Sequence, residues 1–82
     1  MLKIGNEVSF ENEVGDIYSG VITEVLSDSY DDVRLENGEV EYWSKKTKSY
    51  RPVKDRDMKS IFLEVESSRG KTDFVLLKEV LY

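Results

Sequence analysis

Residues 33–44 read Val-Arg-Leu-Glu-Asn-Gly-Glu-Val-Glu-Tyr-Trp-Ser, and the dipeptide Asn37-Gly38 divides this stretch into two alternating halves. A two-residue turn of type I′ needs a positive φ angle at both central positions, and Asn followed by Gly is a preferred pair there. The stretch therefore predicts a β-hairpin whose strands cover residues 30–36 and 39–44.

Two segments upstream of the hairpin also carry strand patterns. Residues 6–11 alternate apolar and polar side chains, and residues 17–26 are rich in β-branched and apolar side chains. Gly20 lies in the middle of the second segment, where a glycine often marks a bulge or a sharp bend. Consecutive strands joined in this way predict an antiparallel meander.

The charged segment 45–59 loses the alternation, so we expect a loop or a short helical turn there. From residue 60 onward apolar side chains alternate with glutamates, which favours a strand. The alternative is a helix that begins at Asp55 and places four apolar residues at helical spacing, namely Met58, Ile61, Phe62 and Val65.

A second hairpin is indicated near the end of the chain, where Ser68-Arg69-Gly70-Lys71 is a turn sequence. Residues 74–77 predict a returning, more buried strand. Residues 78–82 either continue that strand or form one helical turn.

The chain is long enough for one domain only. A domain of 82 residues buries roughly 60–65% of the surface that its unfolded chain exposes, which leaves a small core. We therefore expect a single all-β domain over residues 1–82, with a barrel meander at residues 4–53 and a C-terminal hairpin at residues 60–77. Hydrophobic residues make up 39% of the chain, enough to form a core despite 35% charged residues.

Cysteine and histidine are both absent from the sequence. The usual zinc sites, and the nucleophile systems built on Cys-His or Ser-His-Asp, therefore have no residues to use. We expect no metal, no cofactor and no enzymatic activity. No stretch resembles a secretion signal or a membrane span, so we expect a cytoplasmic protein without a membrane partner.

Charge is divided between the two halves of the chain. Residues 1–43 contain eleven Asp and Glu residues but only two basic ones, whereas residues 44–82 contain ten Lys and Arg residues and six acidic ones. The basic excess is local, because seven of those ten residues lie within residues 45–59. Such a polarity selects partners through its electric field before contact forms, which points to a binding module.

The order of these elements resembles the Tudor-like and SH3-like small β-barrels over residues 4–53. The resemblance is carried by Ile4-Gly5-Asn6-Glu7-Val8-Ser9-Phe10, by the long strand that starts with Ile17-Tyr18, by Val33-Arg34-Leu35, by Glu39-Val40-Glu41-Tyr42-Trp43 and by Tyr50-Arg51-Pro52-Val53. It implies a barrel of five to six strands. Chromo-barrels, bacterial ribosome-associated barrels and many phage proteins share the pattern, so it implies an accessory protein of a phage or bacterium without defining a function.

Members of this family that read methylated side chains use a cage of aromatic rings. The resemblance places four aromatic residues in the corresponding strand regions, namely Tyr18, Tyr30, Tyr42 and Trp43. Since neighbouring residues of a strand point to opposite faces, at most one of Tyr42 and Trp43 can join such a cage. The alternative interpretation is packing in the core or at its rim.

Three functions stay open at this point. The first is an adaptor or inhibitor that contacts another protein through an aromatic and acidic barrel surface. The second is nucleic-acid binding by the basic segment, with lysines and arginine on phosphates and a ring stacking on a base, through Lys45, Lys46, Lys48, Arg51 and Tyr50. The third is an acidic mimic of nucleic acid that blocks a basic host surface. An exposed edge strand would also allow a homodimer.

Overall fold

The computed structural model describes residues 2–12, 14–67 and 70–81 of the chain. In order along the chain its elements are β1 (Glu7–Glu11), β2 (Ile17–Ser27), β3 (Val33–Glu36), β4 (Glu39–Ser44), β5 (Ser49–Pro52), the 3₁₀ segment η1 (Asp55–Ser60), β6 (Ile61–Ser67), β7 (Thr72–Leu76), the 3₁₀ segment η2 (Leu77–Glu79) and β8 (Val80–Leu81). The predicted all-β class is confirmed. Within the described residues no helix has the length and apolar character needed to cross a membrane.

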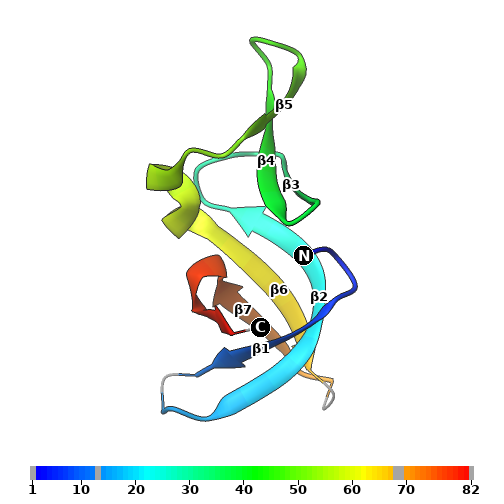
Figure 1. Cartoon of the computed structure of the whole chain (residues 1–82), viewed down its shortest axis with the longest axis vertical. Coiled ribbons are helices and arrows are strands. Elements are labelled where there is room, and N and C mark those ends of the chain that lie inside the picture. The colour runs from blue at the N-terminus through cyan, green and yellow to red at the C-terminus, as the bar shows by residue number, and fades with distance from the viewer. Residues whose placement is uncertain (1, 13, 68–69, 82) are drawn as a thin grey trace.

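The strands form two antiparallel sheets. The larger sheet has the order β7-β6-β2-β1-β8, and the smaller sheet has the order β3-β4-β5. Figure 1 shows the smaller sheet at one end of the larger one, with the β4–β5 hairpin projecting away from the body. The molecule is elongated as a result, with extents of 42 × 23 × 19 Å.

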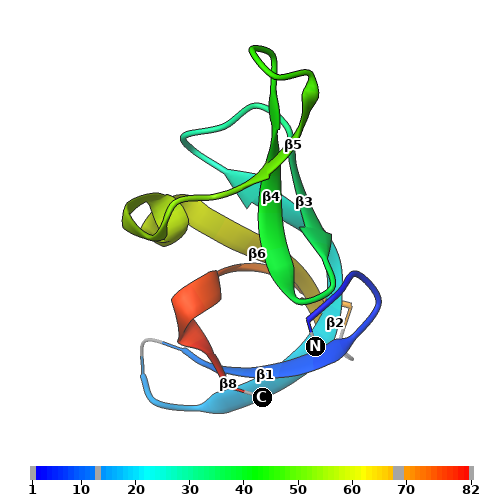
Figure 2. The same ribbon diagram turned by 45° about the horizontal axis from the view of Figure 1, so that its top comes forward.

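The prediction of a barrel of five to six strands is wrong, because among the described residues the two sheets do not close into a barrel. The physical reason is the partner of the long strand β2, which pairs with β6 of the C-terminal hairpin and not with β3. The next strand of the expected meander therefore leaves to start a second sheet. The larger sheet still curls strongly, since the three residues of η2 connect its two edge strands, β7 and β8 (Figure 2).

The Asn37-Gly38 hairpin forms as predicted. The φ angles are 52° at Asn37 and 81° at Gly38, and the residues that flank the turn pair in register as Leu35 with Val40 and Glu36 with Glu39. Strand β4 has the predicted bounds. Strand β3 begins at Val33 and not at residue 30, because the chain bends before it.

The basic segment 45–59 contains more regular structure than the predicted loop or helical turn. Strand β5 pairs with β4 from Ser49 opposite Ser44 to Pro52 opposite Glu41. As the edge strand of the small sheet, β5 has no buried residue and therefore lacks the apolar alternation by which a strand is predicted. Proline is tolerated there because an edge strand leaves N–H positions without a ladder partner.

The core is built mainly by β2 and β6. Among the described residues, the largest fully buried side chains are those of Ile22, Ile61, Leu63 and Val65. The alternation of the last three along β6 confirms the predicted strand over the helical alternative. In place of the alternative helix, which would run from Asp55 to Val65, the helical structure that begins at Asp55 is the short 3₁₀ segment η1, and it ends at Ser60.

Gly20 has a different role from the predicted bulge. The irregularity in β2 falls between Ile22 and Glu24, where the register against β6 shifts. A Cβ atom on Gly20 would lie 2.6 Å from Cγ1 of Val65 and 2.7 Å from the carbonyl oxygen of Glu66. The glycine therefore permits the close approach of β6 to β2.

The predicted segment at residues 74–77 is buried only in part. In β7 the side chain of Val75 is buried, but that of Phe74 is 62% exposed, because neighbouring residues of this edge strand alternate between its faces. Leu77 already belongs to η2, the helical turn that was one of the two alternatives for the tail. Ser68 and Arg69 of the predicted turn, and Tyr82 of the tail, lie outside the described residues, but β6 and β7 pair as a hairpin requires.

Candidate functional site

Tyr42 and Trp43 lie on opposite faces of the small sheet, so the aromatic candidates fall into separate groups. On the face that packs against the core, the rings of Tyr30 and Tyr42 stack with centroids 4.3 Å apart and planes inclined by 22°. The Tyr30 hydroxyl donates a hydrogen bond of 2.8 Å to Oδ2 of Asp57 in η1. This bond to a carboxylate raises the pKa of Tyr30 above its ordinary value. Both rings are half-buried and connect the small sheet to the core.

The outer face of the same sheet presents a second aromatic pair. Trp43 and Tyr50 are paired directly across β4 and β5, and their rings meet edge to face at a centroid distance of 5.2 Å and an angle of 72°. Trp43 remains 41% exposed. Its indole therefore offers an open aromatic surface to a ligand.

Tyr50 is held in place from two further sides. The guanidinium carbon of Arg34 lies 3.8 Å from the centroid of the Tyr50 ring. Nε and Nη2 of Arg34 both reach Oε1 of Glu41, at 2.9 and 2.8 Å. The Tyr50 hydroxyl donates to Oδ2 of Asp32 at 3.3 Å, and the carbonyl of Asp32 accepts from the backbone N–H of Trp43. The aromatic pair is thus fixed before any ligand arrives.

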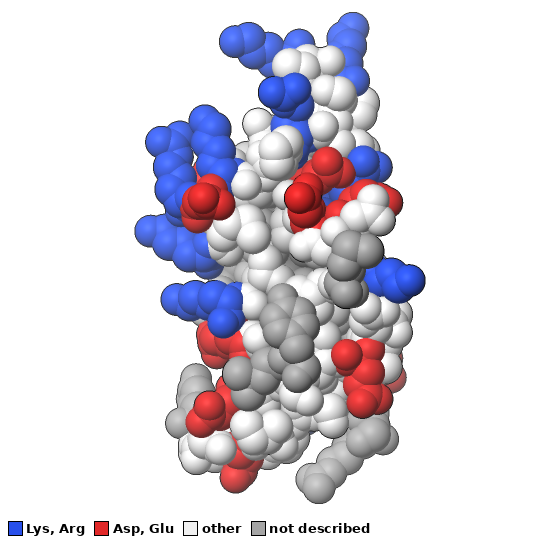
Figure 3. All heavy atoms as spheres, in the orientation of Figure 1, with Lys and Arg blue, Asp and Glu red and all other residues white. Residues whose placement is uncertain are grey.

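The turn between β4 and β5 carries three further basic side chains. Lys45, Lys46 and Lys48 are exposed, and Figure 3 shows blue side chains at the end of the molecule where the hairpin projects. Two ion pairs are found in the described part of the chain, Arg34 with Glu41 and Arg56 with Asp57, and neither involves these lysines. The turn itself is held by the Lys48 amide, which donates to the carbonyl of Ser44 at 2.7 Å.

The rest of the basic segment lies elsewhere. Arg51 is exposed but pairs with Tyr42 across β4 and β5, so it is on the face opposite Tyr50. Lys54, Arg56 and Lys59 belong to η1 and the residue before it, at the side of the molecule below the hairpin in Figure 1. The predicted basic segment therefore presents two separate groups of charges.

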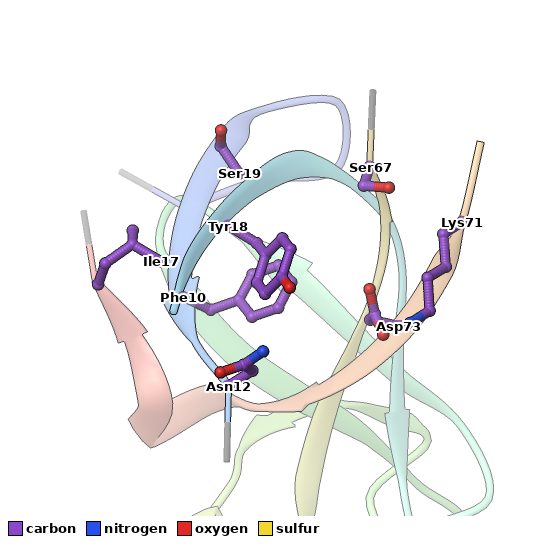
Figure 4. Close-up of a pocket in the computed structure, with 8 residues that line it drawn as sticks. All are labelled: Phe10, Asn12, Ile17, Tyr18, Ser19, Ser67, Lys71 and Asp73. Carbon is purple, nitrogen blue, oxygen red and sulfur yellow. The ribbon is translucent and has the colours of Figure 1, made fainter. Parts of the chain in front are cut away.

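Tyr18 is far from the other aromatic candidates in the fold, because it belongs to β2 of the larger sheet. Its ring stacks on Phe10 with centroids 5.9 Å apart. Figure 4 shows both rings at the opening of the curled sheet, in a cavity of about 370 Å³. The cavity is also lined by Asn12, Ile17, Ser19, Ser67, Lys71 and Asp73.

Arg34 is a site residue that the sequence predictions did not include. The signal for it was present, because the Asn37-Gly38 turn sets Arg34 opposite Glu41 and therefore on the face of Trp43. Its contact with Tyr50 depends on β5, and the pattern of the sequence did not predict that strand. The other partner-binding residues stay predictions, now divided among the hairpin, the core-facing stack and the larger sheet.

The described residues contain no group of three Asp or Glu side chains placed to hold a metal ion. Comparisons of the chain with protein-family models, with curated proteins and with solved structures found no match. The geometry of the hairpin with Trp43 and Tyr50, and that of the cavity beside Tyr18, are therefore the basis for a proposed function.

Proposed function

We propose that this chain is a small non-enzymatic module that binds single-stranded nucleic acid on the outer side of its β4–β5 hairpin. The observation that carries the proposal is the exposed Trp43, fixed against Tyr50, directly before a turn with three exposed lysines. Stacking surfaces combined with cationic side chains are the means by which proteins hold single strands.

Each part of the hairpin has a role in this proposal. Lys45, Lys46 and Lys48 neutralise phosphates and release their counterions. Trp43 receives an unpaired base on its open surface, and Tyr50 supports the indole from the side. A duplex keeps its bases stacked on one another, so an exposed indole favours single strands over double strands.

The three lysines also favour an anionic ligand, such as the phosphates of a nucleic acid. Contacts from proteins to phosphates are often made by Lys and Arg. The second candidate function, an adaptor or inhibitor that contacts another protein, is favoured by a different observation. Three strongly exposed apolar side chains line two adjoining cavities of the larger sheet, namely Val14, Ile17 and Phe74.

Fluorescence anisotropy with a labelled single strand of about 12 nucleotides tests the proposal. We expect Trp43→Ala to weaken binding by about 5- to 150-fold, since stacking on an aromatic side chain contributes about 1–3 kcal/mol per base. Three phosphate contacts predict a slope of log affinity against log salt of about −2. Lys45→Glu with Lys46→Glu should weaken binding and flatten that slope.

The matched control reverses two charges of the other basic group, Lys54→Glu with Lys59→Glu. It changes the net charge equally but leaves the hairpin intact, and we expect a much smaller loss of affinity. A titration that stays flat at low salt for single strands, or an equal loss in the control, contradicts the proposal.

We also propose that the C-terminal hairpin completes an SH3-like arrangement with the first two strands. This is supported by the pairing of β6 with β2, and by η2, which carries the chain from β7 to β8 beside β1. The small sheet is then an insertion between β2 and β6 that presents the hairpin. An experimental structure in which β8 does not pair with β1 would contradict this arrangement.

A further inference from the structure

The open end of the larger sheet carries a groove that the proposed function does not use. Two adjoining cavities of about 370 and 540 Å³ share four lining residues, Phe10, Asn12, Lys71 and Asp73. The stacked rings of Phe10 and Tyr18 form its floor (Figure 4). The end of β1 and the start of β2, which line this groove, lie at the opposite end of the long axis from the β4–β5 hairpin (Figure 1).

The rim of the groove is strongly apolar. Val14, Phe74 and Ile17 are 79%, 62% and 61% exposed, which makes them the three most exposed large hydrophobic residues of the described chain. Ile17 lines the smaller of the two cavities, and Val14 and Phe74 line the larger one. Single exposed apolar side chains are ordinary, but several gathered around a groove are typical of a contact surface.

The charges of the groove are opposite to those of the hairpin. Three carboxylates line the two cavities, those of Glu11, Asp73 and Glu79, against one lysine, Lys71. The hairpin instead presents exposed lysines beside an exposed indole. Figure 3 shows this polarity along the molecule, with blue side chains at the hairpin end and red ones predominant toward the opposite end. Each end thus offers apolar surface and the charge that the other end lacks.

We propose that the hairpin of one copy of this chain docks in the groove of a second copy, head to tail. Trp43 then covers the apolar rim around Phe74, and the lysines of the turn face the groove carboxylates. Because the two complementary surfaces lie at opposite ends of the long axis, two copies leave one hairpin and one groove unoccupied. Further copies therefore add in a row, unlike a symmetric dimer.

The proposed contact between copies would compete with nucleic acid for the hairpin. A second copy and a nucleic acid would occupy the same lysines and the same indole, so each should displace the other. This consequence rests on the proposed function, whereas the contact between copies does not.

Sedimentation velocity of the full chain and of two complementary variants tests the contact. Lys45→Glu with Lys46→Glu blocks the hairpin, and Phe74→Glu blocks the groove; all three side chains are exposed, so the fold should persist, as circular dichroism would verify. Ile4→Glu is the matched control, since Ile4 is also exposed, at 47%, but lines neither cavity.

We expect the unaltered chain and Ile4→Glu to associate as concentration rises at low salt, and to return to monomers at high salt. Each blocked variant should stay monomeric alone. Mixed in equal amounts they should form a dimer and nothing larger, because one supplies the intact hairpin and the other the intact groove.

Three results would overturn the inference: an unaltered chain that is monomeric at every concentration, a hairpin-blocked variant that still associates, or a mixture that stays monomeric while the unaltered chain associates. The second result would indicate pairing between edge strands.

Oligonucleotide binding by Phe74→Glu separates the two proposals, because this variant keeps its hairpin. If Phe74→Glu binds the oligonucleotide while the unaltered chain stays monomeric, the proposed function stands and the contact between copies is refuted. If Phe74→Glu does not bind the oligonucleotide while the unaltered chain associates, the contact between copies stands and the proposed function is refuted.

Discussion

Arg34 lies over the ring of Tyr50, with its guanidinium carbon 3.8 Å from the ring centroid. The two residues come from β3 and β5, which do not pair with each other, and β4 lies between them. Glu41 on β4 holds the guanidinium through Oε1. The stack therefore ties the three strands of the small sheet together on the face that presents Trp43.

Replacement of Arg34 tests the contribution of this stack. Arg34→Ala should lower the free energy of unfolding by about 1 kcal/mol, because it removes a cation–π contact and a partly exposed ion pair. Urea unfolding measures the change. The matched control is Arg56→Ala, whose ion pair with Asp57 is longer, at 3.9 Å, and more exposed; it should change stability by less than about 0.5 kcal/mol. Equal effects would show that the stack contributes nothing specific.

The hydrogen bond between Tyr30 and Asp57 predicts a pH dependence at the alkaline side. The pKa of Tyr30 is raised in the folded state, chiefly by this bond, so the folded chain retains the phenolic proton more tightly than the unfolded chain does. The stabilisation is complete below the ordinary tyrosine pKa of about 10 and is lost as pH rises through the higher folded value. The free energy of unfolding should therefore fall with pH more steeply than in Tyr30→Phe, which lacks the titrating group. Curves for the two proteins that stay parallel through about pH 10 and above would contradict this assignment.

Gly20 should not tolerate a side chain. Gly20→Ala places a Cβ atom 2.7 Å from the carbonyl oxygen of Glu66, and that backbone atom cannot turn away as a side chain can. We expect a loss of about 1–3 kcal/mol, or a fall of roughly 4–8 °C in Tm for each kcal/mol. The neighbouring Ser19→Ala, at an exposed position of the same strand, is the control and should leave Tm nearly unchanged. A Gly20→Ala protein as stable as the control would refute the close-approach explanation.

Binding and folding should be separable by two substitutions. Leu63→Ala empties a fully buried position and should cost about 2–5 kcal/mol of stability. Trp43→Ala removes a side chain that is 41% exposed, so its main effect should be on oligonucleotide affinity. Thermal unfolding and anisotropy measured on both variants check this, and a Trp43→Ala protein as unstable as Leu63→Ala would indicate a structural role for the indole.

Local patterns in the sequence were sufficient for the features that depend on neighbouring residues. Asn37-Gly38 predicted its turn because only a few residue pairs adopt two positive φ angles readily. Alternation predicted β4 with its correct bounds and the strand β6, and it separated Tyr42 from Trp43. Each of these follows from backbone geometry within a few residues.

The tertiary structure alone decided how the strands are paired and which charges are neighbours. Alternation marks a strand but not its partner, so the pairing of β2 with β6 and the resulting two sheets could not be read from the pattern. Strand β5 has no buried residue and therefore no apolar alternation by which to predict it. The exposure of Phe74 depends on which face of β7 packs against the core, and only the folded chain decides that. The division of charge along the sequence is not the division in space, because the groove carboxylates Asp73 and Glu79 belong to the basic half of the chain. Contacts between residues distant in sequence, which are made only in the folded chain, bring these two together with Glu11 and set the groove apart from the hairpin lysines.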